Sequence, residues 1–223
     1  MLGKILKDAL SGRDKTQAAE NRSFLPMYEK HFAPLLAGRT EGFRTIFKAL
    51  EARCLTLDRP ALIVETGSLR QPGNWAGDGQ STILWREFSC VHPCELHTVD
   101  LDPEAAKVVR ELCGDGEDLH VHTGDSVAFL YEMAKGDNPP QIDMLYLDSF
   151  DFDIDDPFPS AFHHIKELIA ARPCLRKGSI IAIDDNFILP DGKMTGKGYL
   201  AIQWFEHLNI PCMYQGHQYV WQL

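Results

Sequence analysis

The spacing of hydrophobic residues changes at about Pro60. Before it, in FLPMYEKHFAPLLAG (24–38) and EGFRTIFKALEARCL (41–55), hydrophobic residues recur every three or four positions. That spacing places them on one face of a helix. Beyond Pro60 they occur in short runs separated by helix-like stretches. The pattern predicts a helical N-terminal segment followed by alternating strands and helices.

Five of the short runs are typical of buried strands: 61–65, 95–100, 119–123, 142–148 and 179–184. The helix-like segments between them are 81–90, 102–113, 125–136 and 160–175. Such alternation favours right-handed β-α-β units and a parallel sheet covered on both faces. After a further helix at 199–208, the runs 211–215 and 219–223 are separated by a short turn and indicate an antiparallel hairpin. The expected fold is α/β and Rossmann-like: a doubly wound, mostly parallel seven-stranded sheet with a C-terminal antiparallel hairpin and N-terminal helices.

Composition narrows the classes of partner. The formal net charge of −10 argues against a nucleic-acid-binding surface, which needs a basic stripe. No apolar run approaches the roughly 20 residues that cross a bilayer, and MLGKILKDALSGRDK reads as a surface helix because it lacks the features of a signal peptide. Six cysteines are too few for a disulfide scaffold. We expect a cytoplasmic protein with a small-molecule substrate and no nucleic-acid or membrane partner, and homo-oligomer formation is left open.

Each of the five predicted strands ends in polar residues, or is directly followed by them, at its carboxyl end. They are Glu65-Thr66-Gly67, Asp100, Gly124-Asp125-Ser126, Asp148 and Asp184-Asp185-Asn186. Ligands of such sheets bind at this edge. An acid at Asp100 suits ribose hydroxyls, and Asp125 with Ser126 lies where an adenine amino group would find an acceptor. The edge therefore predicts a nucleoside-type binding site.

A glycine-rich turn joins the first strand to the helix that begins near Ser81. Its glycines, Gly67 to Gly79, let the backbone turn sharply and approach a ligand closely. The turn matches neither the dinucleotide nor the nucleoside-triphosphate motif, and no lysine follows the glycines. A nucleoside triphosphate is therefore not expected.

The strand-end motifs between Ala61 and Leu223 resemble those of class I S-adenosylmethionine-dependent methyltransferases. Within that superfamily, IDMLYLDS and LRKGSIIAIDDN are similar to metal-dependent O-methyltransferases of the catechol type, and to sugar and macrolide O-methyltransferases that end this strand in paired aspartates. The resemblance implies a methyltransferase domain over 58–223, a helical extension over 1–57 on the substrate or lid side, and O-methylation of a small hydroxylated molecule. Hydrolase- or hydroxylase-like chemistry on the same fold and metal, or a non-catalytic cofactor-binding role, stays open.

The resemblance also implies ligands for each strand end. Those for S-adenosylmethionine are Glu65 and Gly67 at the methionine end, Asp100 at the ribose, and Asp125 with Ser126 near the adenine; Gly79 and Ser81 are also expected to bind the cofactor. Asp148 would hold a divalent metal together with Asp184-Asp185 or with Asp185-Asn186, because the sequence leaves the register open. Such hard oxygen ligands suit Mg²⁺, and also Mn²⁺ or Ca²⁺.

The general base is the least defined part of the predicted site. The catechol enzymes have a lysine three residues after the first metal aspartate, and Asp151 stands there in this sequence. The catalytic candidates are Asp148 and the adjacent His163 and His164 of the helix 160–175. Adjacent histidines on an amphipathic helix also serve packing. We therefore expect the position of each side chain in the fold to decide whether it is catalytic or structural.

Overall fold

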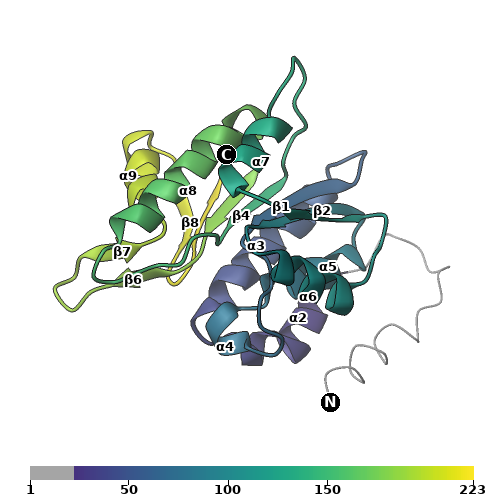
Figure 1. The fold of residues 1–223 in the computed structure, drawn as a ribbon, viewed down its shortest axis with the longest axis horizontal. Coiled ribbons are helices and arrows are strands. Elements are labelled where there is room, and N and C mark those ends of the chain that lie inside the picture. The colour runs from purple at the N-terminus through teal and green to yellow at the C-terminus, as the bar shows by residue number, and fades with distance from the viewer. Residues whose placement is uncertain (1–22) are drawn as a thin grey trace.

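A mixed sheet of seven strands lies at the centre of the computed structural model, which describes residues 23–223 (Figure 1). Its strands are β1 (Ala61–Thr66), β2 (Cys94–Asp100), β3 (Leu119–Thr123), β4 (Met144–Leu147), β5 (Ile180–Ile183), β8 (Cys212–Gln215) and β9 (Tyr219–Gln222). Their order is β3-β2-β1-β4-β5-β9-β8; the first five are parallel, and β9 is antiparallel to both neighbours. The predicted α/β fold with its C-terminal antiparallel hairpin is confirmed. The predicted helix in MLGKILKDALSGRDK lies outside the described residues.

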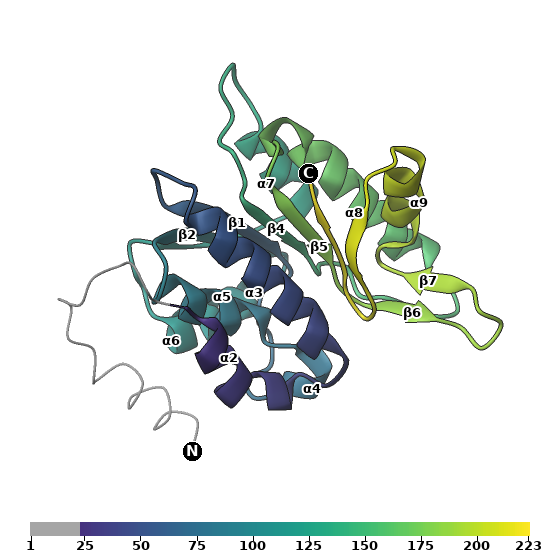
Figure 2. The same cartoon turned by 180° about the vertical axis from the view of Figure 1, so that it is seen from behind.

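Helices cover both faces of the sheet. They are α2 (Leu25–His31), α3 (Thr40–Cys54), α4 (Trp75–Asp78), α5 (Ser81–Ser89), α6 (Pro103–Cys113), α7 (Ser126–Met133), α8 (Phe158–Ala171) and α9 (Tyr199–His207), with short 3-10 turns at Ala33–Leu35, Ala37–Arg39 and Arg172–Cys174. α7, α8 and α9 lie on the face nearer the viewer in Figure 1, and α2, α3, α5 and α6 lie on the face seen in Figure 2. This placement is the doubly wound arrangement that the alternating pattern predicts.

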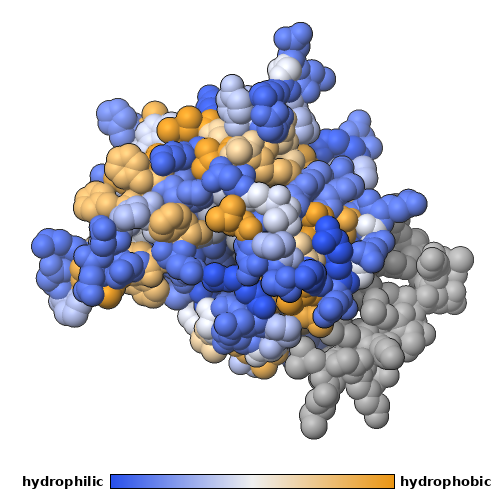
Figure 3. All heavy atoms as spheres, viewed as in Figure 1, coloured by the Kyte–Doolittle hydropathy of each residue, from blue (hydrophilic) through white to orange (hydrophobic). Residues whose placement is uncertain are grey.

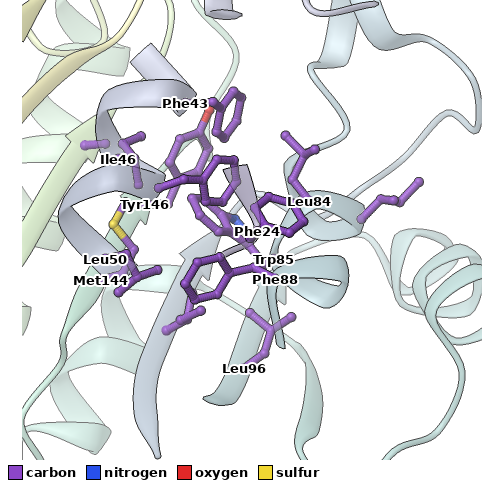
Figure 4. Close-up of a cluster of buried hydrophobic side chains, with 14 of the residues drawn as sticks. Phe24, Phe43, Ile46, Leu50, Leu84, Trp85, Phe88, Leu96, Met144 and Tyr146 are labelled. Carbon is purple, nitrogen blue, oxygen red and sulfur yellow. The ribbon is translucent and has the colours of Figure 1, made fainter. Parts of the chain in front are cut away.

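The alternation of side chains along the strands divides the core into two clusters. On β1, Ile63 faces the cluster of α3, α5 and α6, whereas Leu62 and Val64 face that of α7, α8 and α9. Figure 4 shows the first cluster, in which the Phe43 ring of α3 stacks on Tyr146 of β4 with centroids 5.5 Å apart. The described part of the N-terminal segment therefore shares its core with the sheet, across the boundary predicted at residue 57.

Two segments contain short elements that the hydrophobic periodicity did not predict. The helical pattern of 24–38 is interrupted: α2 ends at His31, and two short 3-10 turns, the first of which contains Pro34, lead to Arg39. Between the predicted strand 179–184 and the predicted helix 199–208, the chain forms a small hairpin of β6 (Asn186–Ile188) and β7 (Met194–Gly196). Both departures matter because each ends on a cation, Arg39 or Lys197, that points into the site.

The surface is largely hydrophilic, with hydrophobic groups gathered over the half formed by α8 and α9 (Figure 3). Phe158, Phe162 and Ile169 of α8 are exposed. Among residues 23–223, no helix has the length and apolar character needed to cross a bilayer.

Candidate active site

A pocket lies at the carboxyl ends of the parallel strands, where the sequence predicts the site. Its lining includes eight predicted residues: Gly67, Ser81, Asp100, Asp125, Ser126, Asp148, His163 and Asp185. Parallel strands bring their ends to one edge, and so these residues meet although they are far apart in the sequence.

The turn after β1 passes directly against the end of β4. Gly67 has a φ of +82°, and a Cβ there would lie 2.5 Å from the Asp148 carbonyl oxygen. Only glycine permits both the left-handed conformation and this approach. The next residue donates its backbone N–H to Asp100, with Ser68 N and Asp100 Oδ2 2.9 Å apart. One wall of the pocket therefore joins the ends of β1, β2 and β4.

The end of β3 is tied to α8. Asp125 caps α7, because its Oδ1 accepts a hydrogen bond from Ala128 N at 2.8 Å. Ser126 Oγ lies 2.9 Å from His163 Nε2. His163 therefore takes its place on the pocket wall beside the two residues predicted to lie near the adenine.

Glu65 lies beneath the pocket instead of on its wall. Its buried carboxylate accepts hydrogen bonds from Thr82 Oγ1 (2.6 Å), Thr98 Oγ1 (2.7 Å) and Trp85 Nε1 (3.0 Å). Burial raises the pKa of Glu65, and these donors oppose the rise. The carboxylate fixes the start of α5 against β1 and β2, so it supports the glycine turn from below.

Asp148, Asp184 and Asp185 come together at the ends of β4 and β5, as predicted. Two cations that the sequence analysis did not single out lie among them. Lys197 Nζ is 2.6 Å from Asp148 Oδ1 and 3.0 Å from Asp185 Oδ2. Arg39 donates from Nε to Asp184 Oδ2 at 2.6 Å and from Nη2 to Asp185 Oδ1 at 2.8 Å. We call these five side chains the carboxylate–cation cluster.

Gly79 makes room for this arginine. It has a φ of +69°, and a Cβ there would lie 2.8 Å from Arg39 Cδ. Gly79 thus serves the cluster by letting Arg39 pass, although the sequence places it with the cofactor ligands.

Asn186, a member of one of the two predicted metal pairs, uses its side chain in hydrogen bonds to the backbone. Its Nδ2 donates to the carbonyl oxygens of Ile183 (2.8 Å) and Asp184 (3.1 Å), and its Oδ1 accepts from Gly198 N (2.8 Å). Asn186 is therefore used to hold the backbone on either side of the β6–β7 hairpin. The carboxylate pair in the cluster is Asp184 with Asp185.

Neighbouring charges favour the charged forms of Lys197 and Asp185 but not that of Asp148. Burial opposes the charged form of Lys197, which is 2% exposed, but the carboxylates of Asp148 and Asp185 raise its pKa above the ordinary value. Burial likewise opposes ionisation of Asp185, while His217, Lys197 and Arg39 hold its pKa below the usual range. The pKa of Asp148 lies well above its usual range, because burial and the negative charges of Asp184 and Asp185 outweigh the opposing effect of Lys197. Lys197 is a fixed ammonium at neutral pH.

A divalent ion does not fit this arrangement. An ion bound by Asp148 and Asp185 at the usual 2.0–2.6 Å would take the place of the Lys197 ammonium, which contacts both carboxylates. Asp184, Asp185 and His217 also offer three nearby donor atoms, but Arg39 hydrogen-bonds to both of those carboxylates. The two cations thus engage both oxygens of Asp185 and one oxygen each of Asp148 and Asp184.

His164, a predicted catalytic candidate, is fully buried outside the pocket. Its Nδ1 lies 2.7 Å from the Ser160 carbonyl oxygen, and its Nε2 finds no hydrogen-bond partner in the described part of the chain. Burial lowers the pKa of His164 to about 4, with the charge of Lys197 adding to this effect and Glu167 opposing it. Of the two adjacent histidines, only His163 can meet a ligand.

Acid should destabilise the protein through His164. Between pH 6.5 and 4 the unfolded chain binds a proton there that the folded chain does not, so stability falls as the pH drops through this window. We expect a loss of about 3 kcal/mol from this group over the whole window. Urea unfolding at pH 7 and pH 5 should show a smaller pH dependence for His164→Gln than for the native chain. Exposed His207→Gln is the control; an equal pH dependence in both variants would contradict the assignment.

The sequence analysis missed the pocket residue Arg70, and it named Asp151 only as the residue at the position of the catechol enzymes' lysine. Arg70 Nη2, from the glycine-rich turn, pairs at 3.0 Å with Asp151 Oδ1, from the loop after β4. Hydrogen bonding to Arg70 lowers the pKa of Asp151. At the position of the catechol enzymes' lysine, this chain therefore has an aspartate, Asp151, and its ion pair with Arg70 joins two segments of the pocket lining. Neither Arg70, Arg39 nor Lys197 stands in a recognisable motif, so no local signal marked them.

A scan of protein-family models finds no match to this sequence, and a search of the curated proteins finds none either. Solved structures do match. Human methyltransferase-like protein 13 in complex with SAH has a TM-score of 0.56 at 16% identity, over 83% of this chain and 82% of that chain. CalS11, a TDP-rhamnose 3'-O-methyltransferase of calicheamicin biosynthesis, has a TM-score of 0.54 at 15% identity, over 98% and 91%. The O-methyltransferase from Bacillus cereus in complex with SAH has a TM-score of 0.51 at 16% identity, over 100% and 97%.

These likenesses, together with the strand order and the strand-end pocket, define the fold. The chain has the α/β fold of class I S-adenosylmethionine-dependent methyltransferases. The resemblance stated from the sequence is confirmed at the level of the fold.

Proposed function

We propose that this chain is an S-adenosylmethionine-dependent O-methyltransferase that acts on a small hydroxylated molecule and uses the carboxylate–cation cluster in place of a divalent metal. The observation that carries the proposal is a single pocket with a nucleoside-type wall, Asp100 with Asp125 and Ser126, and the pair Asp148–Lys197 at its other end. The first part suits the cofactor, and the second suits an acceptor hydroxyl.

The pocket residues fit the cofactor. Asp100 presents a carboxylate that suits the two ribose hydroxyls. Two apolar pocket residues, Leu101 (75% exposed) and Phe150 (51% exposed), offer surface on which an adenine ring would pack. The carboxylates of the pocket also favour a positively charged ligand. When bound, S-adenosylmethionine supplies an electrophilic methyl group.

At the acceptor end, the chain's own groups orient the hydroxyl and handle its proton. The Lys197 ammonium is held by Asp148 and Asp185, and its fixed positive charge can stabilise the negative charge that develops on the acceptor oxygen. Asp148 lines the same pocket and can accept the hydroxyl proton. Holding the acceptor in line with the methyl group supplies proximity and orientation.

Binding of the cofactor is the first test. Replacing Asp100 by alanine should weaken binding of S-adenosylhomocysteine, measured by titration calorimetry, by about 1.5–3 kcal/mol, the range for hydrogen bonds to a charged group. Asp102→Ala is the matched control: Asp102 caps α6 through Glu104 N at 2.9 Å and does not line the pocket.

Equal losses in Asp100→Ala and Asp102→Ala would contradict the ribose assignment, and absence of binding to the native chain would overturn the proposed function. For the acceptor, purified protein with labelled S-adenosylmethionine should be offered hydroxylated small molecules, including phenols, catechols and sugars. The product should carry one additional methyl group on an oxygen, as shown by its mass. The amount of product should be the same with and without a chelator.

A further inference from the structure

Four residues away from the pocket place imidazole and carboxylate groups on one face of the sheet. Glu95 and His97 lie two positions apart on β2, and His120 and His122 lie two positions apart on β3. Residues two apart on a strand point to the same face. Because His97 and His120 are paired across the two strands, all four side chains lie on the same face.

The distances between three of these groups are those of ligands on one ion. Glu95 Oε1 lies 3.1 Å from His97 Nε2 and 3.2 Å from His120 Nε2. Neighbouring donor atoms of a tetrahedral zinc ion with bonds of 2.0–2.1 Å are about 3.3 Å apart. The three donor atoms all lie within 4.8 Å of one another. One ion therefore reaches all three with little side-chain movement.

His122 supplies the contact that would orient one ligand. When His97 Nε2 binds a metal, its Nδ1 carries the proton, and Nδ1 lies 3.1 Å from His122 Nε2, which can accept it in a hydrogen bond. The His122 ring in turn packs on Phe129 of α7, with centroids 4.5 Å apart. Metal-binding histidines characteristically use their second nitrogen in this way.

We propose that Glu95, His97 and His120 bind one divalent transition-metal ion of the kind that prefers imidazole and carboxylate ligands, zinc foremost. Glu95 and His97 also line a shallow groove with Phe129 and Glu132, so the fourth ligand position is open to water. Glu95 precedes Asp100 by five residues, about 17 Å along the strand. The ion therefore lies well away from the cofactor pocket, and this inference is independent of the proposed function.

The ion would join the edge strand to its neighbour. β3 is the outermost strand at its end of the sheet and pairs only with β2 among the described strands. Since two ligands come from β2 and one from β3, binding would stabilise this edge of the folded state. The expected effect is a higher melting temperature with zinc.

The test is a competition titration of Zn²⁺ on the full chain against a chromophoric chelator, with Co²⁺ absorption as a report of tetrahedral geometry. We expect one ion per chain at micromolar affinity or tighter. Loss of a residue that hydrogen-bonds to a metal ligand typically lowers metal affinity by roughly 10–100-fold. His122→Phe should lower zinc affinity within that range, and the double variant His97→Ala/His120→Ala should lower it by more. Glu95→Gln removes a charged ligand without changing size, so it tests the site if the double variant does not fold.

His217→Ala is the matched control, because its imidazole belongs to the other group of close donor atoms, Asp184, Asp185 and His217. Zinc affinity that persists in His217→Ala and disappears in the double variant supports the edge-strand site. Loss in His217→Ala alone, or equal affinity in the native chain, the double variant and Glu95→Gln, would overturn the proposal. S-adenosylhomocysteine binding should be the same in the native chain and in Glu95→Gln, which separates this result from that of the cofactor pocket.

Discussion

Replacing Lys197 by methionine should destabilise the protein by about 3–5 kcal/mol, the usual result of removing one partner from a buried ion pair. Lys197 is 2% exposed and contacts both Asp148 and Asp185. Without it, two close carboxylates are left with less positive charge, and they repel each other in a poorly hydrated place. Urea unfolding would measure the loss.

The same variant should acquire a response to divalent ions. With the ammonium gone, Asp148 and Asp185 are free to bind Mg²⁺ or Mn²⁺ through hard oxygen ligands. Either ion should therefore raise the melting temperature of Lys197→Met but not that of the native chain. Lys193→Met is the control: Lys193 leads into the same hairpin strand, its side chain is 79% exposed, and its ion pair with Asp191 contributes at most about 1 kcal/mol.

An equal magnesium-induced rise in the native chain would contradict this prediction. It would mean that the carboxylates bind a metal beside the lysine, as the sequence resemblance implies. Zinc is avoided in this experiment because of the separate site proposed on β2 and β3.

Replacing Arg39 by methionine should also cost about 3–5 kcal/mol. Arg39 is 5% exposed and donates hydrogen bonds to both Asp184 and Asp185. Asp184 is fully buried, and its remaining donors are Tyr146 Oη at 2.7 Å and Asp185 N at 2.8 Å. Neither of these carries a charge, so the variant leaves Asp184 without its cation.

Arg44→Met provides the comparison. Arg44 lies in α3 and pairs with Glu29 and Glu41, which are both exposed, so its removal should cost about 1 kcal/mol or less. A double-mutant cycle of Arg39→Met with Asp184→Asn should show that the two losses are not additive, since both changes break one contact. Additive losses, or equal losses for Arg39→Met and Arg44→Met, would show that the ion pair does not carry the stability.

The amino-acid sequence by itself determined the order of strands and helices and the edge at which the pocket lies. Hydrophobic periodicity reports which face of each element is buried, and parallel strands necessarily end at one edge. Asp100, Asp125 and Asp148 were found because each lies at the carboxyl end of a strand or within two residues after it, so their position in space follows from local order. The placement of a residue at a strand end depends on its neighbours in the sequence, and so it can be predicted from the sequence.

Only the tertiary structure decided what the side chains at that edge do. Arg39 reaches Asp184 across 145 positions of sequence, and Lys197 reaches Asp148 across 49; each follows a short element that the periodicity did not predict. Glu65 was turned beneath the pocket by three donors, and His164 was buried away from it. A carboxylate at a strand end can bind a metal, a ribose or a buried ammonium, because all three satisfy the same charge. Which of them it meets depends on long-range contacts, and these exist only once the chain has folded.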